Sequence, residues 1–120
     1  MRSVVREESY NSVKVFWLDA DLVLERLRTK AALLARDPRV KRVVLFGSLA
    51  EGRAVPGSDA DILIVLDRDD RSVGDRIPGF MELFSDIGIG VDLFPYTMDE
   101  LDNPVAKTAL SRGVVLFSRD

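Results

Sequence analysis

The fold is decided by residues 43–66, VVLFGSLAEGRAVPGSDADILIVL. Two nearly continuous apolar runs, over residues 40–46 and 62–66, have the length and the β-branched content of strands. Gly47 ends the first run, and Asp59 and Asp61 lead into the second. Because continuous apolar strands are typical of sheets that are covered on both faces, we predict a mostly buried central sheet.

The rest of the chain alternates between strand-like and helix-like patterns. Further strands are expected over residues 13–17, 89–94 and 114–117. Helices are expected from Asp19 or Asp21 to about Arg36, over about 75–86, from Thr97, and between Pro104 and Gly113. This order indicates an α/β fold with a mixed sheet and helices packed against it. We expect one domain over residues 13–120, preceded by a flexible polar segment over 1–12.

The composition limits which catalytic and metal-binding groups the chain can supply. The 120-residue chain has no Cys and no His, so it lacks thiolates, the commonest general base and the commonest zinc ligand. A bound metal would therefore have oxygen ligands, as Mg²⁺, Mn²⁺ and Ca²⁺ prefer. The net charge of −3 argues against direct nucleic-acid binding. Because the sequence has neither a membrane-length apolar run nor a signal-peptide pattern, we expect a cytoplasmic protein without a membrane partner.

Asp59 and Asp61 form the first candidate site. At positions i and i+2 of a strand, their side chains would leave the same face. Two carboxylates this close repel each other unless a cation lies between them or one is protonated. One interpretation is that the pair binds a divalent metal, and the other is that it belongs to a polar turn that enters a strand.

Gly47 and Ser48 form the second candidate site. They follow an apolar strand, and residues 49–51 are expected to begin a short helix. A glycine allows a ligand to approach the backbone, a helix N-terminus attracts anions, and the Ser48 hydroxyl adds a donor. A phosphate cradle beside a metal pair would suit a nucleoside triphosphate, although a Gly-Ser pair alone is also typical of a plain turn.

Together these residues resemble the nucleotidyltransferase domain of the DNA polymerase beta superfamily. The signature is a Gly-Ser or Gly-Gly pair, about ten residues, and then Asp-apolar-Asp, which match Gly47-Ser48 and Asp59-Ala60-Asp61. Family members complete the site with a third carboxylate on a neighbouring strand, and Asp92 stands in the right chain order. The chain departs from the family at Glu51, where many members have Arg. Two interpretations are open: Arg53 takes over that contact, or Glu51 points to solvent.

The resemblance implies a Mg²⁺-dependent enzyme, with Mn²⁺ as the other metal considered. Asp59, Asp61 and Asp92 would be catalytic and would bind two metals, while Gly47, Ser48, Arg53 and Ser58 would bind the triphosphate, for which ATP is expected. The reaction would transfer a nucleoside monophosphate to an acceptor hydroxyl and release pyrophosphate.

The resemblance also leaves a second function open. Short members of this superfamily often act with a separate helical protein of the HEPN type, sometimes as the antitoxin of a toxin–antitoxin pair. The alternative is therefore a nucleotide- or partner-binding subunit with weak or no catalysis. Neither the acceptor nor the oligomeric state follows from the residues, and a homo-oligomer stays open.

Overall fold

The computed structural model describes residues 3–119. A four-stranded sheet has the order β5-β4-β3-β6, formed by β3 (Val40–Phe46), β4 (Ala60–Leu66), β5 (Val91–Thr97) and β6 (Val114–Ser118). Strands β4 and β5 are parallel, whereas β3 is antiparallel to both β4 and β6. The predicted α/β fold with a mixed central sheet is confirmed.

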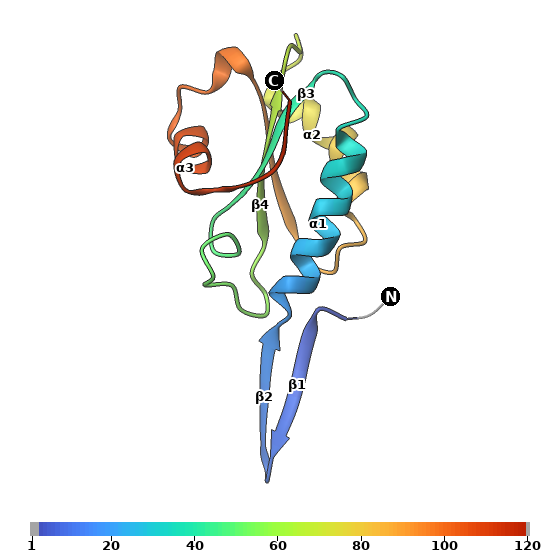
Figure 1. Ribbon diagram of the computed structural model, residues 1–120, viewed down its shortest axis with the longest axis vertical. Coiled ribbons are helices and arrows are strands. Elements are labelled where there is room, and N and C mark those ends of the chain that lie inside the picture. Colours follow the sequence, from blue (N-terminus) through green and yellow to red (C-terminus); the bar gives the residue numbers. More distant parts are fainter. Residues whose placement is uncertain (1–2, 120) are drawn as a thin grey trace.

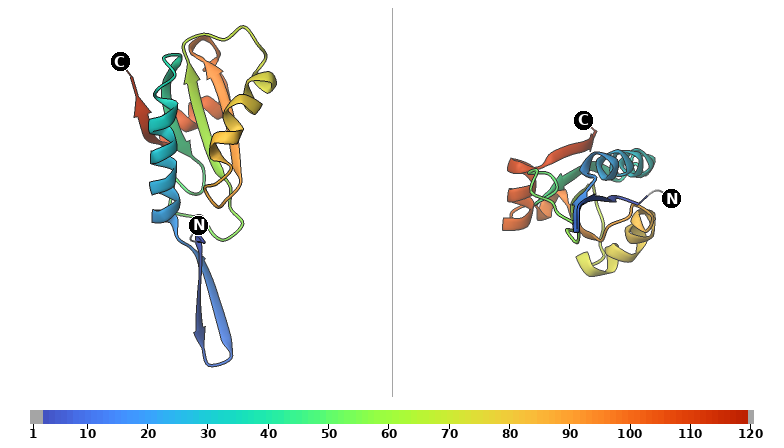
Figure 2. Two further views of the ribbon diagram at one scale, coloured as in Figure 1. Left: turned by 90° about the vertical axis from the view of Figure 1, so that its right-hand side faces the viewer. Right: turned by 90° about the horizontal axis from the view of Figure 1, so that it is seen from below.

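Helices lie on both faces of this sheet (Figure 1). They are α1 (Ala20–Leu34), α2 (Val73–Met81) and α3 (Pro104–Arg112), with short 3₁₀ turns η1 (Glu82–Phe84) and η2 (Met98–Glu100). Helices α1 and α2 share one face and α3 covers the other, as the views in Figures 1 and 2 agree. Alternate strand residues divide accordingly, so that Ile62 packs in the cluster with α1 and Leu63 packs in the cluster with Ala109 of α3.

The helix ends follow their sequence signals. The Asp19 side chain accepts a hydrogen bond from the backbone N–H of Leu22 and caps α1. Thr97 and Glu100 form the expected capping box at η2. Asn103 caps α3 and Gly113 follows its last residue. Of the helices described over residues 3–119, none combines the length and the apolar character needed to cross a membrane.

The bounds of α2 and β5 differ from the prediction for physical reasons. The helix expected over 75–86 is α2 followed by η1, because the last turn tightens to 3₁₀ geometry, as is common at helix ends. The strand expected over 89–94 is β5, which continues past Pro95. A proline is tolerated there because β5 is at the edge of its sheet.

The N-terminal segment corrects the sequence analysis. We predicted a flexible segment over 1–12, but β1 (Val5–Tyr10) pairs antiparallel with β2 (Val13–Leu18) in a hairpin. Asn11, in the two-residue turn, has a φ of 56°. The pattern was missed because the polar strand β1 has no apolar alternation, and its order depends on pairing with β2. Residues 1–2 of the expected segment lie outside the described part of the chain.

Candidate functional site

Two of the three predicted acidic residues lie side by side at one end of the sheet. Asp61 of β4 and Asp92 of β5 are register partners in the parallel ladder, and Asp61 is also opposite Phe46, the last residue of β3. The parallel direction of β4 and β5 places both carboxylates near the beginning of their strands. The structure thus joins residues that are 31 positions apart in the sequence.

This neighbourhood is electrostatically unfavourable for bare carboxylates. Partial burial raises the pKa of Asp61 above its ordinary value, and the negative charges of Asp92 and Asp59 raise it further. Such crowding is relieved either by a proton or by a cation between the carboxylates.

Asp59 lies one residue before β4 and points toward Gly90, which precedes β5. A Cβ atom at Gly90 would overlap the Asp59 carboxylate, and one at Gly47 would overlap the Asp61 carboxylate. Each of the two glycines therefore leaves the space that one acidic side chain occupies. The role of Gly90 was missed from the sequence, because only the fold places it against Asp59.

The Gly47-Ser48 loop has a conformation that favours glycine, but the expected helix does not follow it. Gly47 has a φ of +80°, which favours glycine, and it directly follows β3. The helix expected over residues 49–51 is absent, and these residues form a turn that ends at Gly52, with a φ of +73°. An anion at this loop would therefore meet the N–H groups of a turn rather than those of a helix N-terminus. Ser48 is half-buried, and within residues 3–119 its hydroxyl makes no hydrogen bond.

The other two predicted nucleotide ligands make contacts within the protein. The Ser58 hydroxyl accepts a hydrogen bond from the backbone N–H of Val55 at 3.0 Å and closes the turn before Asp59. The Arg53 guanidinium lies 3.2 Å from the Glu51 carboxylate and is largely exposed. Its side chain can still turn toward a ligand, because the pair is at the surface.

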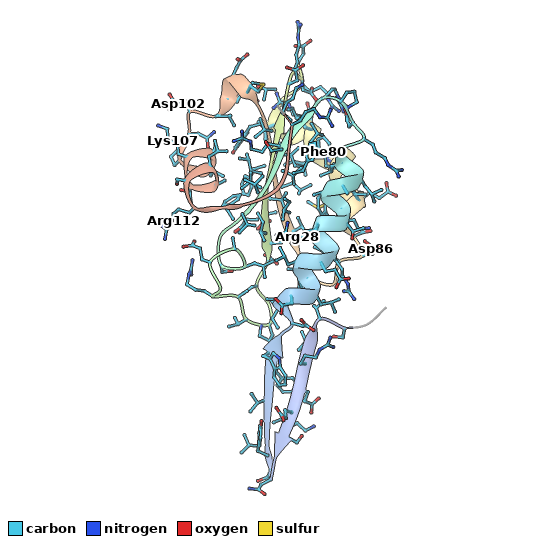
Figure 3. The ribbon with its side chains drawn as sticks, in the orientation of Figure 1. Arg28, Phe80, Asp86, Asp102, Lys107 and Arg112 are labelled. Atoms are coloured by element: carbon cyan, nitrogen blue, oxygen red, sulfur yellow. The ribbon has the colours of Figure 1, made fainter. Side chains whose placement is uncertain are left out.

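Glu51 is held between two arginines. In addition to Arg53, Arg112 at the end of α3 lies 2.7 Å from the carboxylate, and Figure 3 shows Arg112 on the side of α3 toward this loop. The two cations offset the negative charge of the Glu51 carboxylate. Arg112 was missed because 61 residues separate it from Glu51, and no local pattern signals such a contact.

The carboxylates suit a divalent cation chemically, since they are hard oxygen ligands whose mutual repulsion a cation would relieve. Within residues 3–119, however, no three acidic side chains stand close enough to form a ready-made metal site. Asp61 and Asp92 lie side by side in the parallel ladder, and the Asp59 carboxylate points toward Gly90.

A family model described as "Nucleotidyltransferase domain" matches residues 24–115. The chain belongs to this family. Solved structures of other proteins have a similar fold. A nucleotidyltransferase of unestablished activity from Sulfolobus solfataricus is 24% identical, with a TM-score of 0.65 over 83% of this chain and 84% of that one.

Two chains from toxin–antitoxin structures are also similar. One structure contains AMP-PNP (20% identity, TM-score 0.53), and the other is a mutant of MntA–HpeT (19%, 0.56). Each alignment covers 86% of this chain and 76% of the other. At these identities the likeness shows the fold. A comparison with curated proteins gives no match.

Proposed function

We propose that this nucleotidyltransferase-family chain transfers a nucleoside monophosphate from a nucleoside triphosphate to an acceptor hydroxyl. The observation that carries the proposal is the pairing of Asp61 with Asp92 beside a glycine turn at the end of β3. ATP is the triphosphate we expect, with Mg²⁺, or Mn²⁺ in its place. Asp59, Asp61 and Asp92 would hold the metal, which when bound would neutralise phosphate charge and favour the deprotonated acceptor oxygen.

Groups of the protein itself would bind the triphosphate. Backbone N–H groups of the turn after Gly47, together with the Ser48 hydroxyl, would hold phosphate oxygens. Arg53 would leave Glu51 for the triphosphate, while Arg112 would keep Glu51 neutralised. Ser58, whose hydroxyl closes the turn before Asp59, would contact the nucleotide from that turn.

The chemistry is one in-line substitution. The acceptor oxygen forms a bond to the α-phosphorus as the bond from that phosphorus to the bridging oxygen breaks. Pyrophosphate leaves with the electron pair, and the acceptor proton passes to the Asp92 carboxylate.

The acceptor we propose is a partner protein of the small helical HEPN type. The similarity to chains from toxin–antitoxin structures supports this choice. The same similarity favours the second candidate, in which the chain binds a nucleotide and a partner without transfer.

Transfer of label from an α-labelled triphosphate separates these functions. The native protein is incubated with Mg²⁺ or Mn²⁺ and with any small helical protein encoded beside it, and protein-bound label is followed. We expect label on the partner, and we expect Asp92→Asn to lose transfer while it still binds the triphosphate. Asp99→Asn is the matched control and should transfer normally, because Asp99 is an exposed aspartate of η2, which follows the opposite end of β5. Transfer that survives in Asp92→Asn would exclude this role for Asp92, and binding without transfer in the native complex would favour the second candidate.

A further inference from the structure

The β1–β2 hairpin projects from the body as an arm (Figures 1 and 2). It contributes to the long dimension of a molecule that measures 57 × 28 × 25 Å. The two strands have six residues each, so the arm extends about 20 Å. An isolated two-stranded hairpin is at best marginally stable in water, and this one lies outside the family match, which begins at residue 24.

The two edges of the arm differ in charge. The β1 edge carries Arg6, Glu7 and Glu8, whereas the β2 strand carries Lys14 as its one charged residue. Charged side chains protect a strand edge from pairing, and a long apolar edge strand is a template for another strand. The exposed edge that can accept a strand is therefore β2.

The side chains of β2 agree with this assignment. Val13, Val15 and Trp17 share one face of the strand, and they are 60%, 42% and 42% exposed. On the other face, Phe16 is 54% exposed. Apolar side chains on both faces of one strand indicate a surface that is completed by another chain.

We propose that two copies of this protein pair through β2, antiparallel about a two-fold axis, and form a four-stranded sheet. Val15 lies opposite Val15 of the second copy. Val13 then lies opposite Trp17, and Lys14 lies opposite Phe16 of the other copy. The occupant is a second copy because β2 complements itself in this register without placing like charges opposite each other.

Other registers are less favourable. In an antiparallel pair, directly opposite residues have their side chains on the same face of the sheet, so the two-fold axis must set one residue of β2 opposite the same residue of the other copy. An axis at Lys14 would oppose two ammonium groups. An axis at Phe16 would bring Ser12 opposite Ala20, where α1 has already begun. Pairing through β1 about Glu8 or Glu7 would oppose two carboxylates.

The pairing brings the tip of each arm to the candidate site of the other copy. Ser12 comes opposite Leu18 at the base of the second arm. Leu18, Ser58, Asp59 and Gly90 there line a hollow of about 290 Å³. The arm of one copy would thus form part of the rim beside the other copy's Asp59. This consequence rests on the proposed function, whereas the dimer itself does not.

Sedimentation equilibrium of the unliganded protein tests the dimer. We expect twice the 13.4 kDa mass of one chain at micromolar concentration. Val15→Lys sets two ammonium groups opposite each other and should weaken the dimer at least tenfold. The matched control is Leu33→Lys, which makes the same kind of change at an exposed position of α1 and should leave the mass unchanged. A native protein that stays monomeric would overturn the proposal, and so would equal dimerisation in Val15→Lys.

A disulfide test fixes the register, because the chain has no Cys. Val15→Cys places two thiols on residues directly opposite each other, within the range of a disulfide. Glu8→Cys lies beside Val15 in the hairpin, but on the outer strand. Its two thiols would be three strand spacings apart, about 14 Å. We expect mild oxidation to link Val15→Cys and not Glu8→Cys. Equal linking of the two, or none, would overturn this interface. Because neither experiment needs a nucleotide, failure of the dimer is distinguishable from failure of the proposed transfer.

Discussion

Gly90→Ala should damage the candidate site while leaving the fold intact. The backbone at Gly90 is outside the left-handed region, so an alanine adds no backbone strain there. The new methyl group, however, would overlap the Asp59 carboxylate, which must turn away. Asp59 is exposed and precedes β4, so it can move without disturbing the core.

The magnitude follows from the loss of one charged contact. Such contacts are worth about 1.5–3 kcal/mol, which corresponds to roughly 10- to 150-fold in affinity for a metal–triphosphate complex. Calorimetric titration of the native protein and the variant with Mn²⁺ and a non-hydrolysable triphosphate measures this change. Urea denaturation should show a difference in unfolding free energy below about 1 kcal/mol.

Gly79→Ala is the matched control. Nothing lies within 4 Å of a Cβ at this exposed helical position, so affinity should be unchanged and stability equal or slightly higher. If Gly90→Ala bound the metal–triphosphate complex within twofold of the native affinity, the position of Asp59 would not matter for binding.

Four further results are expected. Arg76→Met should lower the unfolding free energy by about 3–5 kcal/mol, because the buried guanidinium donates to the Pro95 carbonyl and to Glu100; Arg28→Met, at an exposed position of α1, should cost far less in the same urea experiment. Hydrogen bonds from Arg76 and from Thr97 lower the pKa of Glu100 from 4.5 to about 2, so this stabilisation is complete above pH 4.5 and lost toward pH 2; thermal melts of Glu100→Gln should show a smaller loss over that window than the native protein. Ser48→Ala should weaken triphosphate binding by about 1 kcal/mol, and an unchanged calorimetric affinity would mean that the hydroxyl does not contact phosphate. Asp61→Asn should abolish the thermal shift that Mn²⁺ produces in the native protein, and a full shift in the variant would argue against Asp61 as a ligand.

The sequence was most informative where one residue could be judged from its neighbours on the same strand or helix. Caps at Asp19 and Thr97 and the apolar runs of β3 and β4 depend on local spacing, and these predictions are confirmed. The family resemblance implied a third carboxylate on a neighbouring strand, with Asp92 as the candidate, and the structure places Asp92 beside Asp61. That these residues bind metal stays a prediction.

What could not be predicted depends on contacts between distant segments. The ion pair of Glu51 with Arg112 and the approach of Asp59 to Gly90 exist only after the sheet has formed. Strand β1 has no apolar pattern because it is completed by β2 and not by the core. The helix expected over 49–51 is absent. The backbone N–H of Glu51 donates to the Gly47 carbonyl, but Gly52 then takes a positive φ and ends the turn.

The parallel register of β4 and β5 also limits how this protein can change in evolution. The crossover between them, residues 67–90, runs largely over the surface, and insertions in its loops would leave the ladder intact. One residue inserted within β5 before Asp92 would have a different effect, because every later side chain would exchange faces. Asp92 would then lie on the face of α1 and leave Asp61 without its neighbour. Among related sequences we therefore expect length variation before Gly90, but a constant spacing from Gly90 to the carboxylate at Asp92.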